Sequence, residues 1–240
     1  MLLNLIKLGQ IDYPTALELQ LQLLKLRQLD KIEDTLLLLE HPPVITVGTA
    51  GKEGNILADE EFLNSMGVTV HHISRGGDVT YHGPGQLVGY PILNLKQQDK
   101  DVKIFFRRLE DTFIELLEKE YGIGAGRDPK YPGVWVGNEK ITALGCAVKR
   151  WVTMHGFAFN INTKLDHFHW INPCGILDKG VTSLQKILGQ AQNMEHITEL
   201  TAEYFTRQYG YTSRYVEKDT FLREVEQLTQ MLESSEEEQK

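Results

Sequence analysis

Apolar side chains recur at helical spacing in two long segments of the chain. The first segment covers residues 12–31 and begins at Asp12, whose side chain can cap the start of a helix. The second covers residues 101–121, with Asp101 as candidate N-cap and Gly122 at the position where helices commonly end. The pattern therefore predicts two long amphipathic helices.

Shorter apolar runs predict strands. TLLLLE (35–40) and VITVG (44–48) are separated by a turn-forming His-Pro-Pro. Residues 134–162 hold three β-rich pieces, with turns at Gly137-Asn138 and around Lys149-Arg150. Because short turns join successive pieces, we expect these strands to pair antiparallel.

The order of the elements predicts the fold class. Two further helices are expected at residues 198–209 and 219–232, so the elements run α, β, α, β, α, α without a regular βαβ repeat. We therefore predict an α+β fold with a mixed, largely antiparallel sheet flanked by helices. Residues 1–215 are expected to form the main domain, and residues 216–240 a C-terminal helix with an acidic tail.

Composition and charge disfavour several classes of protein. The chain has 240 residues, 41% of them hydrophobic, which suits a full core that needs neither disulfides nor a structural metal. A net charge of −8 without any lysine or arginine block disfavours nucleic acid as a partner. Two cysteines, no recognisable signal peptide and no apolar run of membrane-spanning length predict a cytoplasmic protein without a membrane partner.

The most unusual segment is RGGDVTYHGPGQLVGYPI, residues 75–92. Its five glycines surround a strand-like VTYH, whereas an ordinary hairpin turn needs only two or three. Glycine lets a ligand approach the backbone closely. The segment therefore predicts one wall of a binding site, which also carries Arg75, Tyr81, His82 and Gln86.

Other motifs support neither a nucleotide nor a metal. GIGAGR (122–127) follows a predicted helix instead of a strand, its third glycine is misplaced for a dinucleotide site, and no GxxxxGK[ST] loop occurs. His71-His72, and the pair His167 and His169 on one face of an expected strand, lack the spacings typical of zinc sites. We predict no metal and no cofactor.

Cys174 is the candidate nucleophile. It lies between proline and glycine in INPCGILDKGVTSLQ (171–185), a rigid turn suited to present sulfur to a cavity. Cys146 lies in the apolar strand ALGCAV and is most simply a core residue. A thiol needs activation near neutral pH, and an ammonium about 4 Å away would stabilise the thiolate by roughly 4 kcal/mol. Lys140, in GNEKITALG, is our candidate for that ammonium if it lies on a strand; alternatively it is an exposed turn lysine.

These segments together resemble the lipoyl(octanoyl) transferase family. The resemblance rests on RGGDVTYHGPGQLVGYPI, on GNEKITALGCAVKRWVTMHGFAFNIN (137–162) and on INPCGILDKGVTSLQ, with EHPPVITVG near the start, and it spans residues 1–215. It implies the α+β fold of the biotin and lipoate protein ligases. It also implies transfer of an octanoyl group from octanoyl-acyl carrier protein to the lysine amine of lipoyl domains. Such domains occur in 2-oxoacid dehydrogenase E2 subunits and in glycine cleavage H protein.

The resemblance implies roles for individual residues. Cys174 would carry the acyl thioester, and Lys140 would lower the pKa of its thiol. The positions that would bind the acyl group are Arg75, Gly76, Gly77, Asp78, Val79, Thr80, Tyr81, His82, Ala143, Leu144, Gly145, Gly156, Phe157 and Ala158. Either Lys140 or His82 is a candidate to accept the proton of the incoming amine. Thr49 departs from the family pattern, since relatives often carry arginine there.

Two other functions stay open. An ATP-dependent lipoate or biotin ligase has the same fold, but it needs a nucleotide site and no cysteine nucleophile. A non-catalytic scaffold that docks lipoyl domains would need neither Cys174 nor Lys140. ATP-dependent turnover of free octanoate or lipoate would support the ligase, and a covalent octanoyl adduct would exclude the scaffold.

Overall fold

The computed structural model describes residues 1–51, 53–172 and 179–237. The strands are β1 (Leu2–Gln10), β2 (Asp34–Glu40), β3 (Val44–Val47), β4 (Thr69–His72), β5 (Val79–His82), β6 (Gln86–Ile92), β7 (Gly126–Arg127), β8 (Val134–Val136), β9 (Glu139–Lys149), β10 (Val152–Asn160), β11 (Gly180–Val181) and β12 (Thr212–Tyr215). The α-helices are α1 (Tyr13–Gln28), α2 (Glu60–Ser65), α3 (Val102–Tyr121), α4 (Leu184–Leu188), α5 (Met194–Tyr209) and α6 (Lys218–Glu237). Short 3₁₀ helices are η1 (Glu53–Asn55), η2 (Leu95–Gln97) and η3 (Leu165–Trp170).

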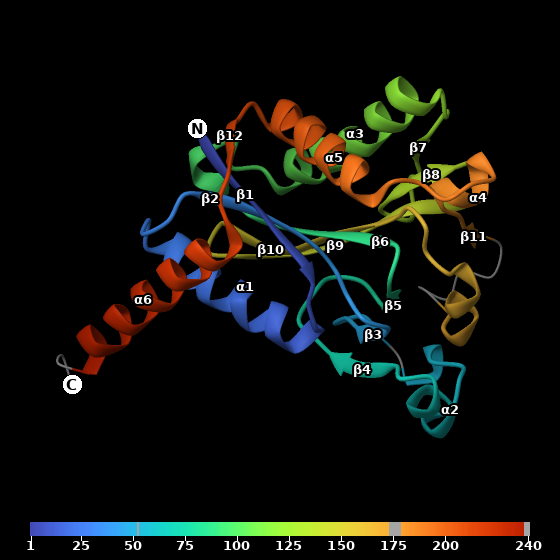
Figure 1. The fold of residues 1–240 in the computed structure, drawn as a ribbon, viewed down its shortest axis with the longest axis horizontal. Helices are drawn as coiled ribbons and strands as arrows, with labels where there is room; N and C mark the ends of the chain where they lie inside the picture. The colour runs from blue at the N-terminus through green and yellow to red at the C-terminus, as the bar shows by residue number, and fades with distance from the viewer. Residues whose placement is uncertain (52, 173–178, 238–240) are drawn as a thin grey trace.

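Two sheets form the centre of the molecule (Figure 1). Among the described residues, the larger sheet has nine strands in the order β12-β1-β2-β6-β10-β9-β8-β7, with β11 also paired to β9. Strand β1 runs parallel to β2 and β12, and β11 runs parallel to β9, whereas the other neighbours are antiparallel. The smaller sheet has the order β4-β3-β5. The predicted α+β class with a mixed, largely antiparallel sheet is confirmed.

Helices cover both faces of the larger sheet (Figure 1). Helices α3 and α5 pack on one face, where the rings of Phe113 and Phe157 lie 4.8 Å apart. Helices α1 and α6 cover the opposite face, with Leu23 and Phe221 buried in one apolar cluster. A separate cluster around Tyr81 joins the smaller sheet to η3. None of the described helices is long and apolar enough to cross a membrane.

Helix ends follow the capping residues that the sequence indicates. The carboxylate of Asp12 accepts a hydrogen bond from the N–H of Thr15 (3.0 Å), and that of Asp101 accepts one from the N–H of Lys103 (2.7 Å). Gly122 follows α3 with a φ of 65°, a left-handed conformation that favours glycine. The predicted start of α1 and both predicted ends of α3 are therefore confirmed, whereas α1 already ends at Gln28, before the predicted end at residue 31. Helices α5 and α6 are also present, each longer than predicted.

Two parts of the chain differ from the pattern-based expectation. Strand β1 is not predicted, because its interior is buried on both faces and shows no simple alternation. The expected strand around His167 and His169 is wrong, since these residues lie in η3. There the His167 ring stacks on Trp170 at 4.0 Å between centroids, and its Nδ1 lies 2.6 Å from the hydroxyl of Tyr81. These contacts stabilise a compact turn instead of an extended chain.

Candidate active site

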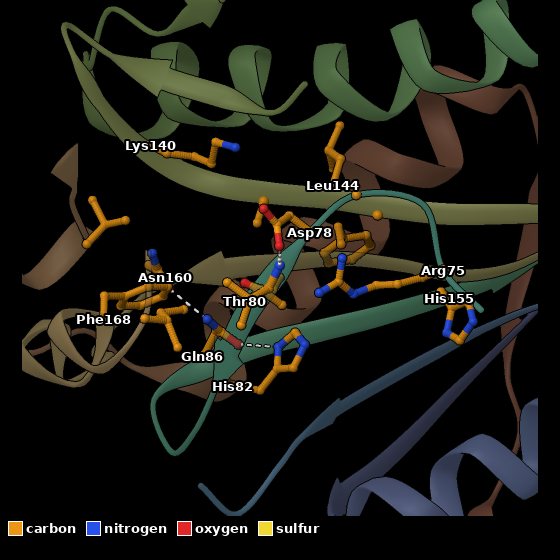
Figure 2. A pocket seen from close by; sticks show the side chains of 18 of the residues that line it. Arg75, Asp78, Thr80, His82, Gln86, Lys140, Leu144, His155, Asn160 and Phe168 are labelled. Carbon is orange, nitrogen blue, oxygen red and sulfur yellow. Dashed lines mark hydrogen bonds between the residues drawn. The ribbon is translucent and has the colours of Figure 1, made fainter. Parts of the chain in front are cut away.

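A pocket of about 520 Å³ lies where the smaller sheet faces strands β9 and β10 (Figure 2). Its walls are formed by residues from the loop before β5 and from β5, β6, β9, β10, η3 and β11. The predicted acyl-binding residues that line it are Arg75, Gly77, Asp78, Val79, Thr80, His82, Ala143, Leu144, Gly145, Gly156, Phe157 and Ala158. Lys140 also lines this pocket. The structure thus brings together side chains from three separate sequence motifs.

Gly76 and Tyr81 are the predicted acyl-binding residues that do not line the pocket. The N–H of Gly76 donates a hydrogen bond to the carbonyl of Cys146 in β9 (3.4 Å). The side chain of Tyr81 is 1% exposed and contacts η3 through its hydroxyl. Both residues therefore support the wall from behind.

Two of the predicted segments pair directly in adjacent strands. Residues 143–145 of β9 are in antiparallel register with residues 156–158 of β10, so that Gly145 lies opposite Gly156 and Leu144 lies opposite Phe157. The turn between the strands converts two separate motifs into one continuous wall. The predicted antiparallel pairing in this region is confirmed.

Arg75 is held inside the opposite wall. Its guanidinium donates hydrogen bonds to the carbonyl of Thr46 (2.8 Å) and to the carbonyl of Gly76 (3.0 Å), and the side chain is 8% exposed. The N–H and hydroxyl of Thr49 both donate to the carbonyl of Arg75, at 3.0 and 3.2 Å. Thr49, the departure from the family pattern, therefore contacts the backbone that carries this guanidinium.

A chain of hydrogen bonds crosses the pocket wall from His82 to Asn160 (Figure 2). His82 Nδ1 donates to the side-chain oxygen of Gln86 (2.7 Å), because that oxygen can only accept. Gln86 in turn donates to the side-chain oxygen of Asn160 (2.9 Å). Burial, followed by the charge of His41, lowers the pKa of His82 to about 3. His82 is therefore neutral near pH 7 and a weak base.

Lys140 lies on strand β9, in register with Trp135 of β8, and is half-buried. The strand interpretation of this lysine is confirmed, and the exposed-turn alternative is wrong. Its ammonium lies 4.8 Å from the centroid of the Trp135 ring. The ammonium of Lys179 lies 4.7 Å from the same ring and forms an ion pair with Asp128. One indole therefore contacts two cations beside the pocket.

The predicted nucleophile Cys174 lies outside the described residues. Asn172 and Lys179, the nearest described residues on either side, both line the pocket. Cys146 is confirmed as a core residue, because it is 8% exposed and belongs to the apolar cluster under α3 and α5. Burial raises the pKa of its thiol. Cys146 therefore has the properties of an inert thiol.

Several pocket residues are not singled out by the sequence. They include Tyr13, Trp135, His155, Phe168 and Lys179. A signal for Trp135 is present, since pairing the β-rich pieces across the Gly137-Asn138 turn places it close to Lys140. Nothing in the sequence of β10 alone indicates that His155 lines the pocket.

No group of three or more His, Cys, Asp or Glu side chains in the described part of the chain is arranged to hold a metal ion.

Comparison with known families gives one match over most of the chain. Residues 12–206 match the model described as lipoyl protein ligase A/B catalytic domain. An octanoyltransferase from Desulforamulus reducens is 56% identical over 211 residues, covering 88% of this chain and 92% of the relative. An octanoyltransferase from Caldicellulosiruptor saccharolyticus is 56% identical over 220 residues, covering 91% and 94%.

Solved structures with the same fold are much more distant in sequence. A lipoate-protein ligase A bound with ATP superposes with a TM-score of 0.74 at 16% identity, over 97% of this chain and 94% of that one. A biotin protein ligase from Aquifex aeolicus in complex with biotin and ATP has a TM-score of 0.54 at 16% identity, over 86% and 70%. These likenesses confirm the fold predicted from the sequence.

Proposed function

We propose that this chain, which belongs to the lipoyl protein ligase A/B catalytic domain family, is an octanoyltransferase. The observation that carries the proposal is its identity of 56% with octanoyltransferases over nearly their whole length. The pocket supports it, because residues of all three motifs that resemble the family meet there. The donor that we propose is octanoyl-acyl carrier protein, and the acceptor is the lysine amine of a lipoyl domain of an E2 subunit or of H protein.

The pocket is suited to an acyl chain. Leu144, Phe157 and Val79 give it apolar walls, and each methylene that leaves water contributes about 0.8 kcal/mol. An eight-carbon acyl group therefore gains roughly 5 kcal/mol from burial. The backbone amides of the glycine-rich wall are candidates to stabilise the oxyanion that forms when a thioester is attacked.

The reaction that we propose proceeds through a thioester on Cys174. Its thiolate attacks the acyl carbon of the donor, a new C–S bond forms, and the C–S bond to the carrier breaks. The leaving carrier thiolate takes a proton from the ammonium of Lys140. The acceptor amine then attacks the acyl-enzyme, its proton passes to the neutral Lys140, and the thiolate of Cys174 leaves.

Lys140 is a better candidate than His82 for the proton acceptor. A histidine whose pKa is lowered to about 3 has little affinity for a proton at neutral pH. Lys140 lines the same pocket and gains a free electron pair once it has protonated the carrier thiolate. We therefore assign proton transfer to Lys140, and a structural role to the hydrogen bond between His82 and Gln86.

The ATP-dependent ligase is the less supported alternative. Its solved representatives share only 15–17% identity with this chain, so the likeness supports a common fold and not a common reaction. The octanoyltransferases are 47–56% identical. A non-catalytic scaffold would form no covalent acyl adduct.

Intact-mass analysis after incubation with octanoyl-acyl carrier protein tests the proposal. One octanoyl group should be added to the wild type and to Cys146→Ala, and none to Cys174→Ala. The adduct should disappear when a lipoyl domain is added, and the mass of that domain should rise instead. An adduct that persists in Cys174→Ala would contradict the nucleophile assignment. Transfer that requires ATP and free octanoate would replace the proposed function by that of a ligase.

A further inference from the structure

Pro91 interrupts an interior strand of the larger sheet. It lies in β6, which has β2 on one side and β10 on the other. Proline has no N–H and is normally confined to sheet edges, bulges and strand starts. The ladder between β6 and β10 runs from Gln86 to Gly89 and ends before Pro91. Beyond the gap, the N–H of Thr153 donates to the carbonyl of Leu93 (3.0 Å).

The same register places His155 of β10 opposite Pro91. His155 has a φ of 56°, a left-handed conformation that is strained for a residue with a side chain. Gly156 follows it, and a Cβ there would lie 2.1 Å from the carbonyl oxygen of Gly89 and 2.6 Å from Cδ of Pro91. The two strands therefore approach so closely at this point that only glycine fits at 156.

Side chains bond the backbone groups that would otherwise pair His155 with Pro91. The carbonyl of Pro91 accepts a hydrogen bond from the hydroxyl of Thr153 (2.6 Å). The N–H of His155 instead donates to the side-chain oxygen of Gln20 (2.8 Å). Gln20 is fully buried, and its Nε2 has no hydrogen-bond partner among the described residues. The unpaired NH₂ lowers stability, whereas the side-chain oxygen satisfies a buried N–H that an apolar residue would leave without an acceptor.

This irregular stretch of β10 belongs to the pocket wall. His155 and Gly156 line the pocket, as do the next two residues of the strand. The Nε2 of His155 has no partner among the described residues, although the side chain is only 2% exposed. Strain of this kind persists only where the surroundings hold it in place.

We propose that Gln20 is a positioning residue for acyl binding. Its bond to the N–H of His155 fixes the left-handed backbone conformation of that residue and thereby the shape of the β10 wall. The inference rests on the proposed octanoyltransferase function and extends it to the choice of acyl chain. A wall held in one shape selects one chain length, whereas a wall that relaxes accepts several. Gln20 itself lies outside the pocket lining and acts through His155.

The test compares acyl chains of six to twelve carbons on the carrier protein. Gln20→Met keeps the volume and removes the acceptor. It should raise the KM for octanoyl carrier by up to about tenfold, because the free energy of one lost buried hydrogen bond limits the effect on acyl binding. It should also reduce the preference for eight carbons, while kcat changes little. Gln20→Glu keeps a carbonyl acceptor and should retain most of the preference. Hydrogen exchange at the amide of His155 should be faster in Gln20→Met than in Gln20→Glu.

Leu23→Ala is the matched control. Leu23 is fully buried in α1, in the same apolar cluster as Met154 of β10, and this variant should lower the Tm without changing the chain-length profile. A wild-type profile in active Gln20→Met, or an equal loss of preference in Leu23→Ala, would overturn the inference. A wild type that transfers no acyl group of any length would instead overturn the proposed function.

Discussion

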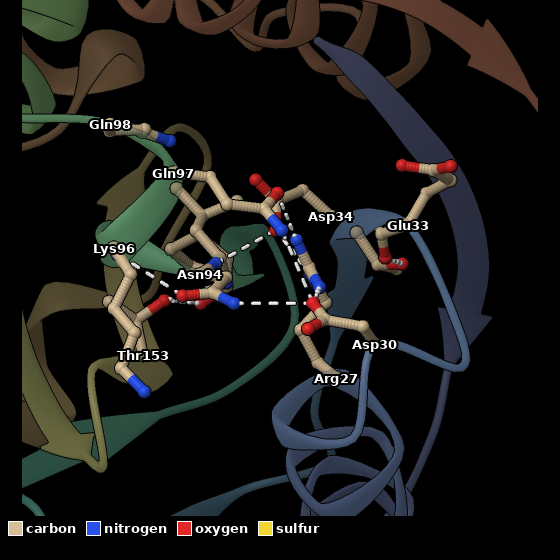
Figure 3. Close-up of polar contacts among 12 residues, drawn as sticks. Arg27, Asp30, Glu33, Asp34, Asn94, Lys96, Gln97, Gln98 and Thr153 are labelled. Carbon is tan, nitrogen blue, oxygen red and sulfur yellow. Dashed lines mark hydrogen bonds and ion pairs between the residues drawn. The ribbon is translucent and has the colours of Figure 1, made fainter.

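The guanidinium of Arg27 and the carboxylate of Asp34 form an ion pair in which both side chains are almost completely buried (Figure 3). Nε of Arg27 lies 2.7 Å from Oδ1 of Asp34, and the two side chains are 3% and 2% exposed. Asp34 also accepts hydrogen bonds from the N–H of Asn94 (2.8 Å) and the hydroxyl of Tyr211 (2.5 Å). One carboxylate thereby joins α1, β2, the segment after β6 and the segment before β12.

Arg27→Met should lower the free energy of unfolding by about 3 kcal/mol or more, because it leaves the charge of Asp34 buried with only neutral donors. Urea unfolding measures the loss. Arg207→Met is the control, since Arg207 and Glu115 form a half-exposed pair at 3.1 Å and such pairs contribute about 1 kcal/mol or less. An equal decrease in the free energy of unfolding in the two variants would show that burial does not make the pair of Arg27 and Asp34 more important than the half-exposed one. Acyl transfer well below the Tm should be unchanged in both, because neither arginine lines the pocket.

Because three histidines are buried, we predict that the free energy of unfolding decreases when the pH is lowered from 6.5. Burial lowers the pKa of His41 and His155 to about 4, and that of His82 to about 3. In the unfolded chain these groups take up protons near pH 6.5. The unfolded state therefore binds more protons between about pH 6.5 and pH 4, and the free energy of unfolding decreases as the pH falls through that window. Each histidine contributes up to about 1.4 kcal/mol per pH unit.

Urea unfolding between pH 7 and pH 5 checks this dependence. The stability should be nearly constant above pH 6.5 and should fall steadily below it. His41→Gln should make the slope smaller, because one of the three groups no longer titrates. A constant stability from pH 7 to pH 5 would show that the unfolded chain gains no protons relative to the folded one.

Features determined by neighbours in the chain can be predicted from the sequence. Asp12 and Asp101 cap their helices because the N–H groups they bond lie two or three residues away. The position of Lys140 beside Trp135 follows from a short turn between two β-rich pieces. The pairing of residues 143–145 with residues 156–158 also follows from a short turn, the one around Lys149-Arg150, between two β-rich pieces.

Features that depend on distant parts of the chain are not visible in the local pattern. Strand β1 is buried on both faces because Leu3 and Leu5 pack in the cluster with α3 and α5, whereas Ile6 and Leu8 pack in the cluster with α1 and α6. Helix α6 begins more than 200 residues after this strand. The bond from His155 to Gln20 joins residues 135 positions apart. No spacing rule connects a glutamine on a helix face with a strained histidine in a strand, so this part of the pocket emerges only from the folded chain.

The end of the chain should be dispensable. Helix α6 extends away from the body of the molecule (Figure 1), and Met231 is 67% exposed. The helix is held by Phe221 and Val225, which are buried beneath the larger sheet. Removal of residues 234–240 should therefore leave the Tm and the rate of acyl transfer unchanged. A large loss of either quantity would show that the acidic tail binds another part of the protein or a partner.

Replacement of Lys140 tests the proposed chemistry directly. If its ammonium stabilises the thiolate of Cys174, alkylation by iodoacetamide stays fast below the pH at which ordinary thiols lose reactivity. Lys140→Met keeps much of the side-chain volume and removes the charge. The midpoint of the alkylation profile should rise by up to about three pH units, and acyl transfer should fall steeply. The measurement is best made in Cys146→Ala, so that only one thiol can react.

Lys140→Arg separates the two roles assigned to the lysine. Arginine supplies a positive charge near the thiolate but does not release its proton near neutral pH. The alkylation profile should therefore stay close to that of the wild type, and the acyl-enzyme should still form, because the leaving carrier thiolate can take its proton from water. Transfer from the acyl-enzyme to the lipoyl domain should be slow, because no neutral amine is present to accept the proton of the attacking lysine. Identical alkylation profiles for the wild type and Lys140→Met would show that another cation activates Cys174. The cation to replace next would then be Lys179, which shares the indole of Trp135 with Lys140.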